Sequence, residues 1–142
     1  MTEKLTLVIV DDDPDDRELF IEAVSELGND LECIEFPGGL EILSRLKGDK
    51  GFRPDYIFLD MNMPLMNGKE CLVELRKLKE LDSAQIIIYT TSQRQDDVKI
   101  MLELGANAFL IKPSVFSHLR TAIKYILSGE KDPSQIEGLF QK

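Results

Sequence analysis

Apolar and polar residues change in blocks along the chain, and each block predicts one helix or one strand. Short continuous apolar runs rich in β-branched residues are typical of strands that are buried on both faces of a sheet. Such strands are predicted at 5–10, 55–60, 85–92 and 108–112, and an alternating apolar and polar run predicts an edge strand at 31–36. Between these runs apolar residues recur at helical spacing, and the predicted helices span 13–27, 38–47, 69–81, 95–105 and 114–128.

Strand and helix thus alternate five times with short connections. This order predicts an α/β fold, a doubly wound five-stranded parallel sheet with helices on both faces, because crossovers between parallel strands are right-handed. The 142 residues suit one domain of ordinary size, which we expect at 1–130. Residues 131–142 are expected to form a short C-terminal extension without an output domain, with Leu139 and Phe140 packed on the body rather than on a partner.

Composition narrows the class of protein. The formal net charge of −9 argues against a nucleic-acid partner, because phosphate contacts need clustered Lys and Arg. The N-terminal apolar run is too short for a signal peptide, and no stretch approaches the roughly 18 apolar residues that span a bilayer. We therefore expect a cytoplasmic protein with no membrane partner, in which Cys33 and Cys71 are reduced thiols. The single histidine, His118, lies far from the predicted strand ends and is expected to have no phosphoryl-carrying or ligand role.

Polar residues follow the predicted buried strands at the point where each strand ends. They are Asp11, Asp12, Asp60, Thr90, Thr91 and Lys112, and Lys112 is followed by Pro113. Because the carboxyl ends of parallel strands meet at one edge of the sheet, three carboxylates, a hydroxyl and an ammonium should converge there. Carboxylates repel one another and are costly to desolvate, so they either share protons or bind a hard divalent cation such as Mg²⁺. A lysine suits a phosphoryl oxygen, and an aspartate can act as a nucleophile that forms an acyl phosphate.

Five aspartates crowd the six positions from 11 to 16, and we divide them into two groups. Asp11 and Asp12 end the first strand and belong to the chemistry. Asp13 is predicted to cap the first helix with Pro14 in its first turn, where a missing N–H has no cost. The last two aspartates would favour the helix dipole, and Asp16 occupies the third position of a capping box. On this interpretation only the first pair is essential to the chemistry.

Four motifs, in order, carry a specific resemblance to a known family. They are IVDDD, IFLDMNMPLMNG, IIIYTTS and FLIKP, with 30 residues from Asp60 to Thr90 and 22 more to Lys112. The chain resembles a response-regulator receiver domain of two-component signalling, of the stand-alone, chemotaxis-protein-like type. The resemblance implies a flavodoxin-like (βα)5 fold with strand order 2-1-3-4-5.

The resemblance also implies a metal site and an acceptor. Asp60 would be the phosphorylated residue. Asp12 would ligate Mg²⁺ directly, Asp11 largely through water, and Asp60 and the main-chain carbonyl of Asn62 would complete the protein's share, with Mn²⁺ as a possible substitute. Asn62 and Ser92 would flank the phosphoryl group and tune its hydrolysis.

Further roles follow from the same resemblance. Thr90 would bind the phosphoryl group through its hydroxyl, and Lys112 would pair with another of its oxygens. Phe109 would be an aromatic switch residue that rotates inward when Thr90 moves toward the phosphate, although a buried Phe in a short strand is ordinarily part of the core. The bond between Lys112 and Pro113 would be cis, as is usual in the family.

The function implied is that of a single-domain response regulator. It would accept a phosphoryl group from a sensor histidine kinase or a histidine phosphotransfer protein and signal to a downstream protein through a conformational change. It would be no enzyme beyond catalysing its own phosphorylation and dephosphorylation. A homodimer through the face of the fourth helix, fifth strand and fifth helix is a further expectation.

Two other classes of protein remain open. A small phosphatase of haloacid-dehalogenase type also combines an aspartate nucleophile with Mg²⁺, a hydroxyl and a lysine. Its nucleophile, however, opens a D-x-D motif after the first strand, whereas here the first strand ends in consecutive aspartates and the Met-Pro loop follows Asp60. A degenerate receiver that binds a partner but takes no phosphate is disfavoured, because every functional position of the family is filled.

Overall fold

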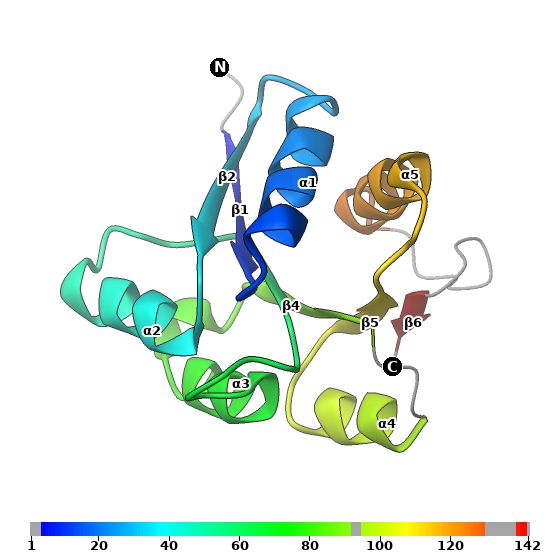
Figure 1. The fold of residues 1–142 in the computed structure, drawn as a ribbon. Coiled ribbons are helices and arrows are strands. Elements are labelled where there is room, and N and C mark those ends of the chain that lie inside the picture. Colours follow the sequence, from blue (N-terminus) through cyan, green and yellow to red (C-terminus); the bar gives the residue numbers. More distant parts are fainter. Residues whose placement is uncertain (1–3, 92–94, 130–138, 142) are drawn as a thin grey trace.

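The central feature of the computed structural model is one sheet with helices on both faces (Figure 1), and the described residues are 4–91, 95–129 and 139–141. The strands are β1 (Leu5–Val10), β2 (Leu31–Phe36), β3 (Tyr56–Leu59), β4 (Gln85–Thr90), β5 (Ala108–Ile111) and β6 (Leu139–Gln141). The α-helices are α1 (Pro14–Ser25), α2 (Gly39–Gly48), α3 (Gly68–Arg76), α4 (Gln95–Glu103) and α5 (Phe116–Leu127). The predicted alternation of strands and helices is confirmed, with bounds that differ by a few residues.

The sheet has the order β2-β1-β3-β4-β5-β6. Its first five strands are parallel, so the expected order 2-1-3-4-5 is confirmed. The sixth strand was not predicted: the main chain of 139–141 pairs antiparallel with β5, with Leu139 opposite Leu110. Three residues are too few for periodicity to reveal a strand, and the free edge of β5 offers unpaired main-chain groups to such a segment. The expected packing of the Leu139 and Phe140 side chains lies outside the described side chains.

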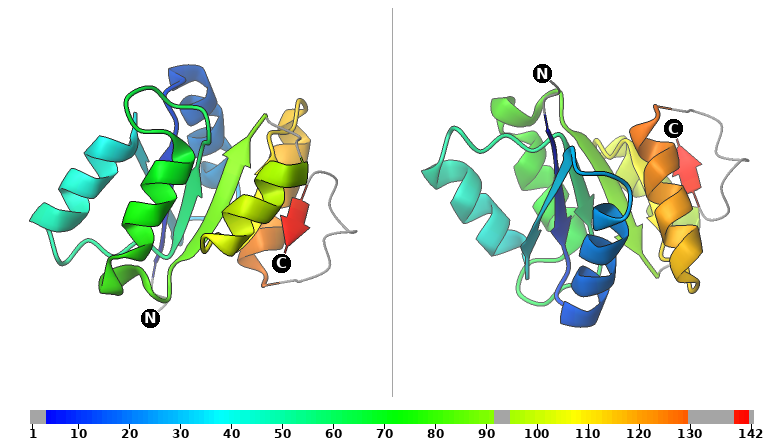
Figure 2. Two further views of the ribbon diagram at one scale, coloured as in Figure 1. Left: turned by 90° about the horizontal axis from the view of Figure 1, so that it is seen from below. Right: turned by 90° about the horizontal axis from the view of Figure 1, so that it is seen from above.

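The core is divided by the sheet into two layers. Helices α2, α3 and α4 cover one face, and α1 and α5 cover the other (Figure 2). Alternate residues of β1 serve the two layers: Val8 and Val10 pack with the first set of helices, and Leu7 and Ile9 with the second. All four are fully buried, which explains why the strand reads as a continuous apolar run.

One predicted helix is interrupted. The apolar spacing predicted a single helix over 69–81, but α3 ends at Arg76 and a short 3-10 helix, η1 (Lys79–Leu81), follows. The Arg76 guanidinium folds under the end of α3 and donates hydrogen bonds to the carbonyls of Leu81 and Ala84. These contacts draw the following turn inward, and periodicity alone does not detect them. No helix in the described part of the chain is long and apolar enough to cross a membrane.

Candidate functional site

Buried polar side chains lie at the carboxyl ends of the strands. Within the described residues three polar side chains are buried: Asp11 and Thr90 are fully covered and Asp60 is 5% exposed. Each follows or ends a different strand, β1, β4 and β3, at its carboxyl end. Burying carboxylates costs free energy unless partners compensate for it. The carboxyl ends of the strands, where the sequence predicted a site, therefore carry buried polar side chains rather than solvent-exposed ones.

The acidic residues at these strand ends form a cluster that could hold a metal ion. Asp11, Asp12 and Asp60 each offer a carboxylate oxygen, and these oxygens lie within 4.8 Å of one another. Asp12 is exposed, whereas the other two are buried. Three carboxylate oxygens suit a hard divalent cation such as Mg²⁺ or Mn²⁺ better than a soft metal. The donor set therefore fits the expected kind of ion, and water can complete its shell on the exposed side.

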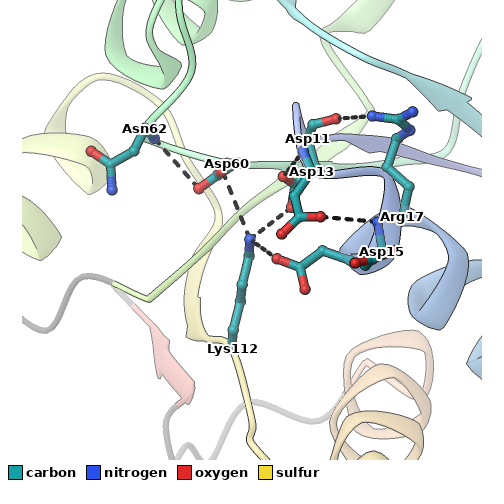
Figure 3. A network of polar contacts seen from close by, with 8 residues as sticks. Asp11, Asp13, Asp15, Arg17, Asp60, Asn62 and Lys112 are labelled. Carbon is teal, nitrogen blue, oxygen red and sulfur yellow. Dashed lines mark hydrogen bonds and ion pairs between the residues drawn. The ribbon is translucent and has the colours of Figure 1, made fainter.

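Asn62 lies beside this cluster with its side chain exposed. Its main-chain N–H donates to Asp60 Oδ1 at 3.4 Å, a long contact within the loop that follows β3 (Figure 3). The roles of its carbonyl as a metal ligand and of its side chain in hydrolysis stay predictions. Ser92, the other residue expected to tune hydrolysis, lies outside the described residues.

Lys112 brings a positive charge into the cluster from the end of β5. Its Nζ donates to Asp11 Oδ2 at 2.7 Å and lies 3.7 Å from Asp60 Oδ2 (Figure 3). A second hydrogen bond, of 2.8 Å, goes to Oδ2 of Asp16 on α1. Burial lowers the pKa of Lys112, but the bonds to Asp11 and Asp16 outweigh this effect and raise that pKa above its ordinary value. The side chain is therefore an ammonium at neutral pH.

The electrostatic state of Asp60 is set by opposing effects. The net result is that the pKa of Asp60 is raised from 3.8 to about 6. Burial is the largest cause and the charge of Asp11 adds to it, whereas Lys112, the N–H of Asn62 and a hydrogen bond from Thr90 lower the pKa. Asp60 is therefore mostly ionised at neutral pH, although burial destabilises its charged form. Added positive charge at the cluster would stabilise this anion.

Thr90 is the hydroxyl residue that the fold brings to Asp60. Its side chain is fully buried and contributes a hydrogen bond to Asp60, whereas Thr91 is exposed. The choice of Thr90 from spacing agrees with this arrangement. Phe109 in β5 is also fully buried and belongs to the core beside α4, where Val98 and Met101 lie in the same cluster. The proposed switch role of Phe109 stays a prediction.

The first turn of α1 begins as predicted. The carboxylate of Asp13 accepts a hydrogen bond of 2.9 Å from the N–H of Asp15, and Pro14 occupies the first helical position. Asp13 also donates its own N–H to Asp11 Oδ1 at 3.0 Å. The start of the helix is therefore joined directly to one of the buried carboxylates of the cluster.

Asp16 lies in the first turn of α1 as predicted, but the capping-box prediction for this residue is wrong. Its carboxylate accepts from Lys112 and does not close a capping box. Sequence reasoning missed this residue because it was grouped with the helix-starting aspartates. A signal was present: Asp16 lies four residues before Phe20, which is fully buried, so both are on the inward face of α1.

The prediction of a cis peptide bond between Lys112 and Pro113 is also wrong. The described residues contain no cis peptide bond, so the bond between Lys112 and Pro113 is trans. Trans is favoured for bonds to proline by about 0.5–1 kcal/mol unless the surroundings impose cis. In the trans form Lys112 already reaches its two carboxylate partners.

Fold and site together define a class of protein: a doubly wound α/β domain with acidic residues, a hydroxyl and a lysine at the carboxyl edge of its sheet. Comparison with known proteins agrees. A family model described as the response regulator receiver domain matches residues 7–124. The response regulator Rcp1 of Synechocystis sp. is 31% identical over 110 residues, which cover 75% of this chain and 75% of Rcp1. The chain belongs to the response regulator receiver family, as its four motifs predicted.

Solved structures give the same result. The phosphorylated cyanobacterial phytochrome response regulator RcpA matches with a TM-score of 0.80 at 26% identity, over 90% of this chain and 97% of RcpA. The Mn²⁺-bound form of response regulator Rcp1 matches with a TM-score of 0.75 at 26% identity, over 97% of this chain and 99% of the Rcp1 chain. The flavodoxin-like fold of the family is thereby confirmed. The protein is a receiver of two-component signalling, and its site is compatible with acceptance of a phosphoryl group on an aspartate.

Proposed function

We propose that Asp60 accepts a phosphoryl group from a sensor histidine kinase or a histidine phosphotransfer protein in a Mg²⁺-dependent reaction. The observation that supports this best is the meeting of a buried carboxylate with an ammonium 3.7 Å away and a buried hydroxyl at the same strand ends. A carboxylate oxygen of Asp60 attacks phosphorus, a P–O bond forms, and the P–N bond of the donor phosphohistidine breaks. The electron pair of that bond stays with the donor imidazole. The product is an aspartyl phosphate on this chain.

The acidic residues hold the metal in this proposal. Asp11, Asp12, Asp60 and the main-chain carbonyl of Asn62 would bind Mg²⁺, or Mn²⁺ in its place. The ion supplies charge neutralisation where a carboxylate and a phosphoryl group meet. Asp12 faces solvent and leaves room for water, whereas Asp11 contributes from a buried position.

Lys112 and Thr90 bind the phosphoryl oxygens. The ammonium pairs with one oxygen and the hydroxyl donates to another, and neither contact exists before phosphorylation. This difference in contacts shifts a two-state equilibrium toward the active form. Phe109 follows Thr90 inward as the switch residue, and Asn62 and Ser92 set the rate at which the acyl phosphate is hydrolysed. The protein acts as a catalyst on its own phosphorylation and dephosphorylation and on no other substrate.

The signalling unit is the receiver domain at 1–130, and residues 131–142 are an extension of it. Its output is binding to a downstream protein in the cytoplasm, with neither nucleic acid nor a membrane as partner. A homodimer through α4, β5 and α5 is part of the proposal. Because β6 pairs with the outer edge of β5, such a dimer would have to form around β6 or displace it.

A small phosphodonor tests the acceptor directly. The full chain is incubated with Mg²⁺ and acetyl phosphate, and its mass is followed together with the lability of the adduct in acid and base. We expect one labile phosphoryl adduct that is absent from Asp60→Asn and retained in Asp15→Asn, which removes an exposed carboxylate of α1 instead. Absence of the adduct in the unmodified chain, or steady hydrolysis of phosphate esters, would overturn the proposal; the second result would favour the phosphatase class.

A further inference from the structure

Lys112 is shared between two carboxylates that have different surroundings. Asp11 belongs to the acidic cluster that could hold a metal ion, whereas Asp16 lies on α1 and is not part of that cluster. The distances from Lys112 Nζ are 2.7 Å to Asp11 and 2.8 Å to Asp16, both shorter than the 3.7 Å to Asp60. The ammonium is therefore held nearer to these two residues than to the carboxylate that we propose as acceptor.

Asp16 is fixed in place by the contacts of α1. Beside it, Arg17 donates from Nη1 to the main-chain oxygen of Asp11 at 2.7 Å and from Nε to Glu35 at 2.8 Å. These bonds tie the first turn of α1 to the end of β1 and to β2. The cap formed by Asp13 holds the same turn from its other side. Asp16 thus presents its carboxylate from a backbone that is anchored at several points.

The lysine is more buried than its partner on α1. The Lys112 side chain is 11% exposed and that of Asp16 is 32% exposed. The ammonium also lies 5.4 Å from the centre of the Tyr89 ring, which covers it on another side. The Lys112 ammonium can therefore occupy few positions. Each of these positions lies beside one of the carboxylates of Asp11, Asp16 and Asp60.

We propose that Asp16 is a positioning residue that holds Lys112 back from the acceptor and competes with the phosphoryl group for its ammonium. The inference rests on the proposed function, because it concerns how Lys112 reaches an oxygen of the phosphorylated Asp60. To pair with that oxygen, the ammonium must lengthen or give up its bond to Asp16. The contact therefore stabilises the unphosphorylated state and opposes the phosphorylated one.

The consequence is a weaker response to phosphoryl ligands than the acceptor site alone would give. Removing the carboxylate frees Lys112 to approach Asp60, so a phosphoryl group or its analogue should bind more tightly. A charged hydrogen bond with one partly exposed partner corresponds to an effect of about threefold to tenfold in an equilibrium constant. Loss of the negative charge also weakens attraction for Mg²⁺, so the comparison requires saturating Mg²⁺.

The test compares Asp16→Asn with its neighbour Asp15→Asn. Both changes remove one negative charge from the first turn of α1, but Asp15 is exposed, and the carboxylates that pair with Lys112 are those of Asp11, Asp16 and Asp60. Beryllofluoride is titrated into each full-length variant at saturating Mg²⁺, and binding is followed by nuclear magnetic resonance of the main-chain amides. We expect affinity to rise about threefold to tenfold in Asp16→Asn and to stay unchanged in Asp15→Asn. Equal or weaker binding in Asp16→Asn would overturn the inference.

A double-mutant cycle shows whether the effect passes through the lysine. In a Lys112→Gln background, Asp16→Asn should no longer change beryllofluoride affinity. An undiminished effect in that background would refute a positioning role. In metal-free protein, exchange of the Lys112 ammonium protons with water should accelerate in Asp16→Asn and not in Asp15→Asn, and unchanged exchange would also refute it.

The proposed function and this inference fail in different ways. If the unmodified chain binds no beryllofluoride and forms no adduct with acetyl phosphate, the acceptor role of Asp60 is wrong. If it does both, and Asp16→Asn behaves like the unmodified chain, only the role of Asp16 is wrong.

Discussion

Gly68 lies directly against the main chain of Asp60. A Cβ atom at residue 68 would come 2.4 Å from the carbonyl oxygen of Asp60 and 2.6 Å from the Cα of Met61, and the N–H of Gly68 donates to Met61 O at 2.8 Å. The loop after β3 is therefore closed by a contact that admits no side chain. The first residue of α3 is therefore in direct backbone contact with the candidate acceptor, Asp60.

Gly68→Ala should consequently displace the acceptor loop. Backbone atoms cannot give way as a flexible side chain can, so we expect loss of stability of about 1–3 kcal/mol together with loss of divalent-cation binding and of phosphorylation. Urea denaturation and calorimetric titration with Mg²⁺ measure the two effects. Gly48→Ala is the matched control, because a Cβ at residue 48 meets no atom within 4 Å. An alanine at residue 68 that binds Mg²⁺ normally would contradict this account.

Ionised Asp60 should destabilise the metal-free protein. Its pKa is raised from 3.8 to about 6 in the folded state, chiefly by burial, so the folded chain binds a proton more readily than the unfolded chain. This group's contribution to stability is therefore complete below about pH 4 and is lost as the pH rises through about 6. Asp60→Asn removes the charge, and at neutral pH in chelator it should raise the free energy of unfolding by about 2 kcal/mol.

The pH series provides the control for that prediction. The advantage of Asp60→Asn should shrink as the pH falls toward 4, where the native residue is also uncharged, and at neutral pH when saturating Mg²⁺ is added. Urea denaturation at several pH values measures it. A variant that is less stable than the unmodified chain in chelator at neutral pH would show that the attraction between Asp60 and Lys112 outweighs the cost of burial.

Asp12 should matter for the metal and little for the fold. Its side chain is exposed, in contrast to Asp11 and Asp60, with which it shares the acidic cluster. Asp12→Asn should lower Mg²⁺ affinity by about tenfold or more, because a direct carboxylate ligand is lost. Stability in chelator should stay within about 0.5 kcal/mol, as is usual for surface changes. Calorimetric titration with Mg²⁺ and Mn²⁺, with Asp15→Asn as the control, measures the change; an unaltered affinity would remove Asp12 from the metal site.

Much of the site could be predicted because strand ends are visible in the sequence. The apolar runs before Asp11, Asp60 and Thr90 locate those residues at the carboxyl edge of a parallel sheet. Their burial follows from the same geometry, since each residue directly follows or ends a strand that is covered on both faces. The order of the elements and the pattern of apolar residues were sufficient to predict these positions, because each of them depends only on where a strand ends.

The partners of a long side chain could not be predicted in that way. Lys112 was located at the end of β5, but its bond to Asp16 joins residues that are 96 positions apart. The capping-box interpretation of Asp16 used a local rule, whereas the contact across the sheet edge determines its orientation. The strand at 139–141 was missed for a related reason: its pairing with β5 depends on an exposed edge elsewhere in the chain.

Arg76 joins the segments at the amino-terminal ends of the strands, opposite the candidate site. Its loss should lower the stability of the fold without affecting phosphorylation. It lies at the end of α3, near the amino-terminal ends of β4 and β5, and donates four hydrogen bonds. The acceptors are the main-chain oxygens of Gly105, Leu81 and Ala84, at 2.9, 2.8 and 3.1 Å, and Asn107 Oδ1, at 2.7 Å. Arg76→Met keeps the length of the aliphatic stem but leaves these oxygens without their charged donor.

We expect Arg76→Met to lower the free energy of unfolding by about 3 kcal/mol, because several part-buried acceptors lose a charged hydrogen bond at once. Lys77→Met, which removes the exposed ion pair of 2.8 Å with Glu74, should change the free energy of unfolding much less. Urea denaturation of both variants measures the difference. Below the transition, both should still form the acetyl phosphate adduct, since the guanidinium lies at the far end of the strands from Asp60. Loss of adduct formation in folded Arg76→Met would mean that the two ends of the strands are coupled.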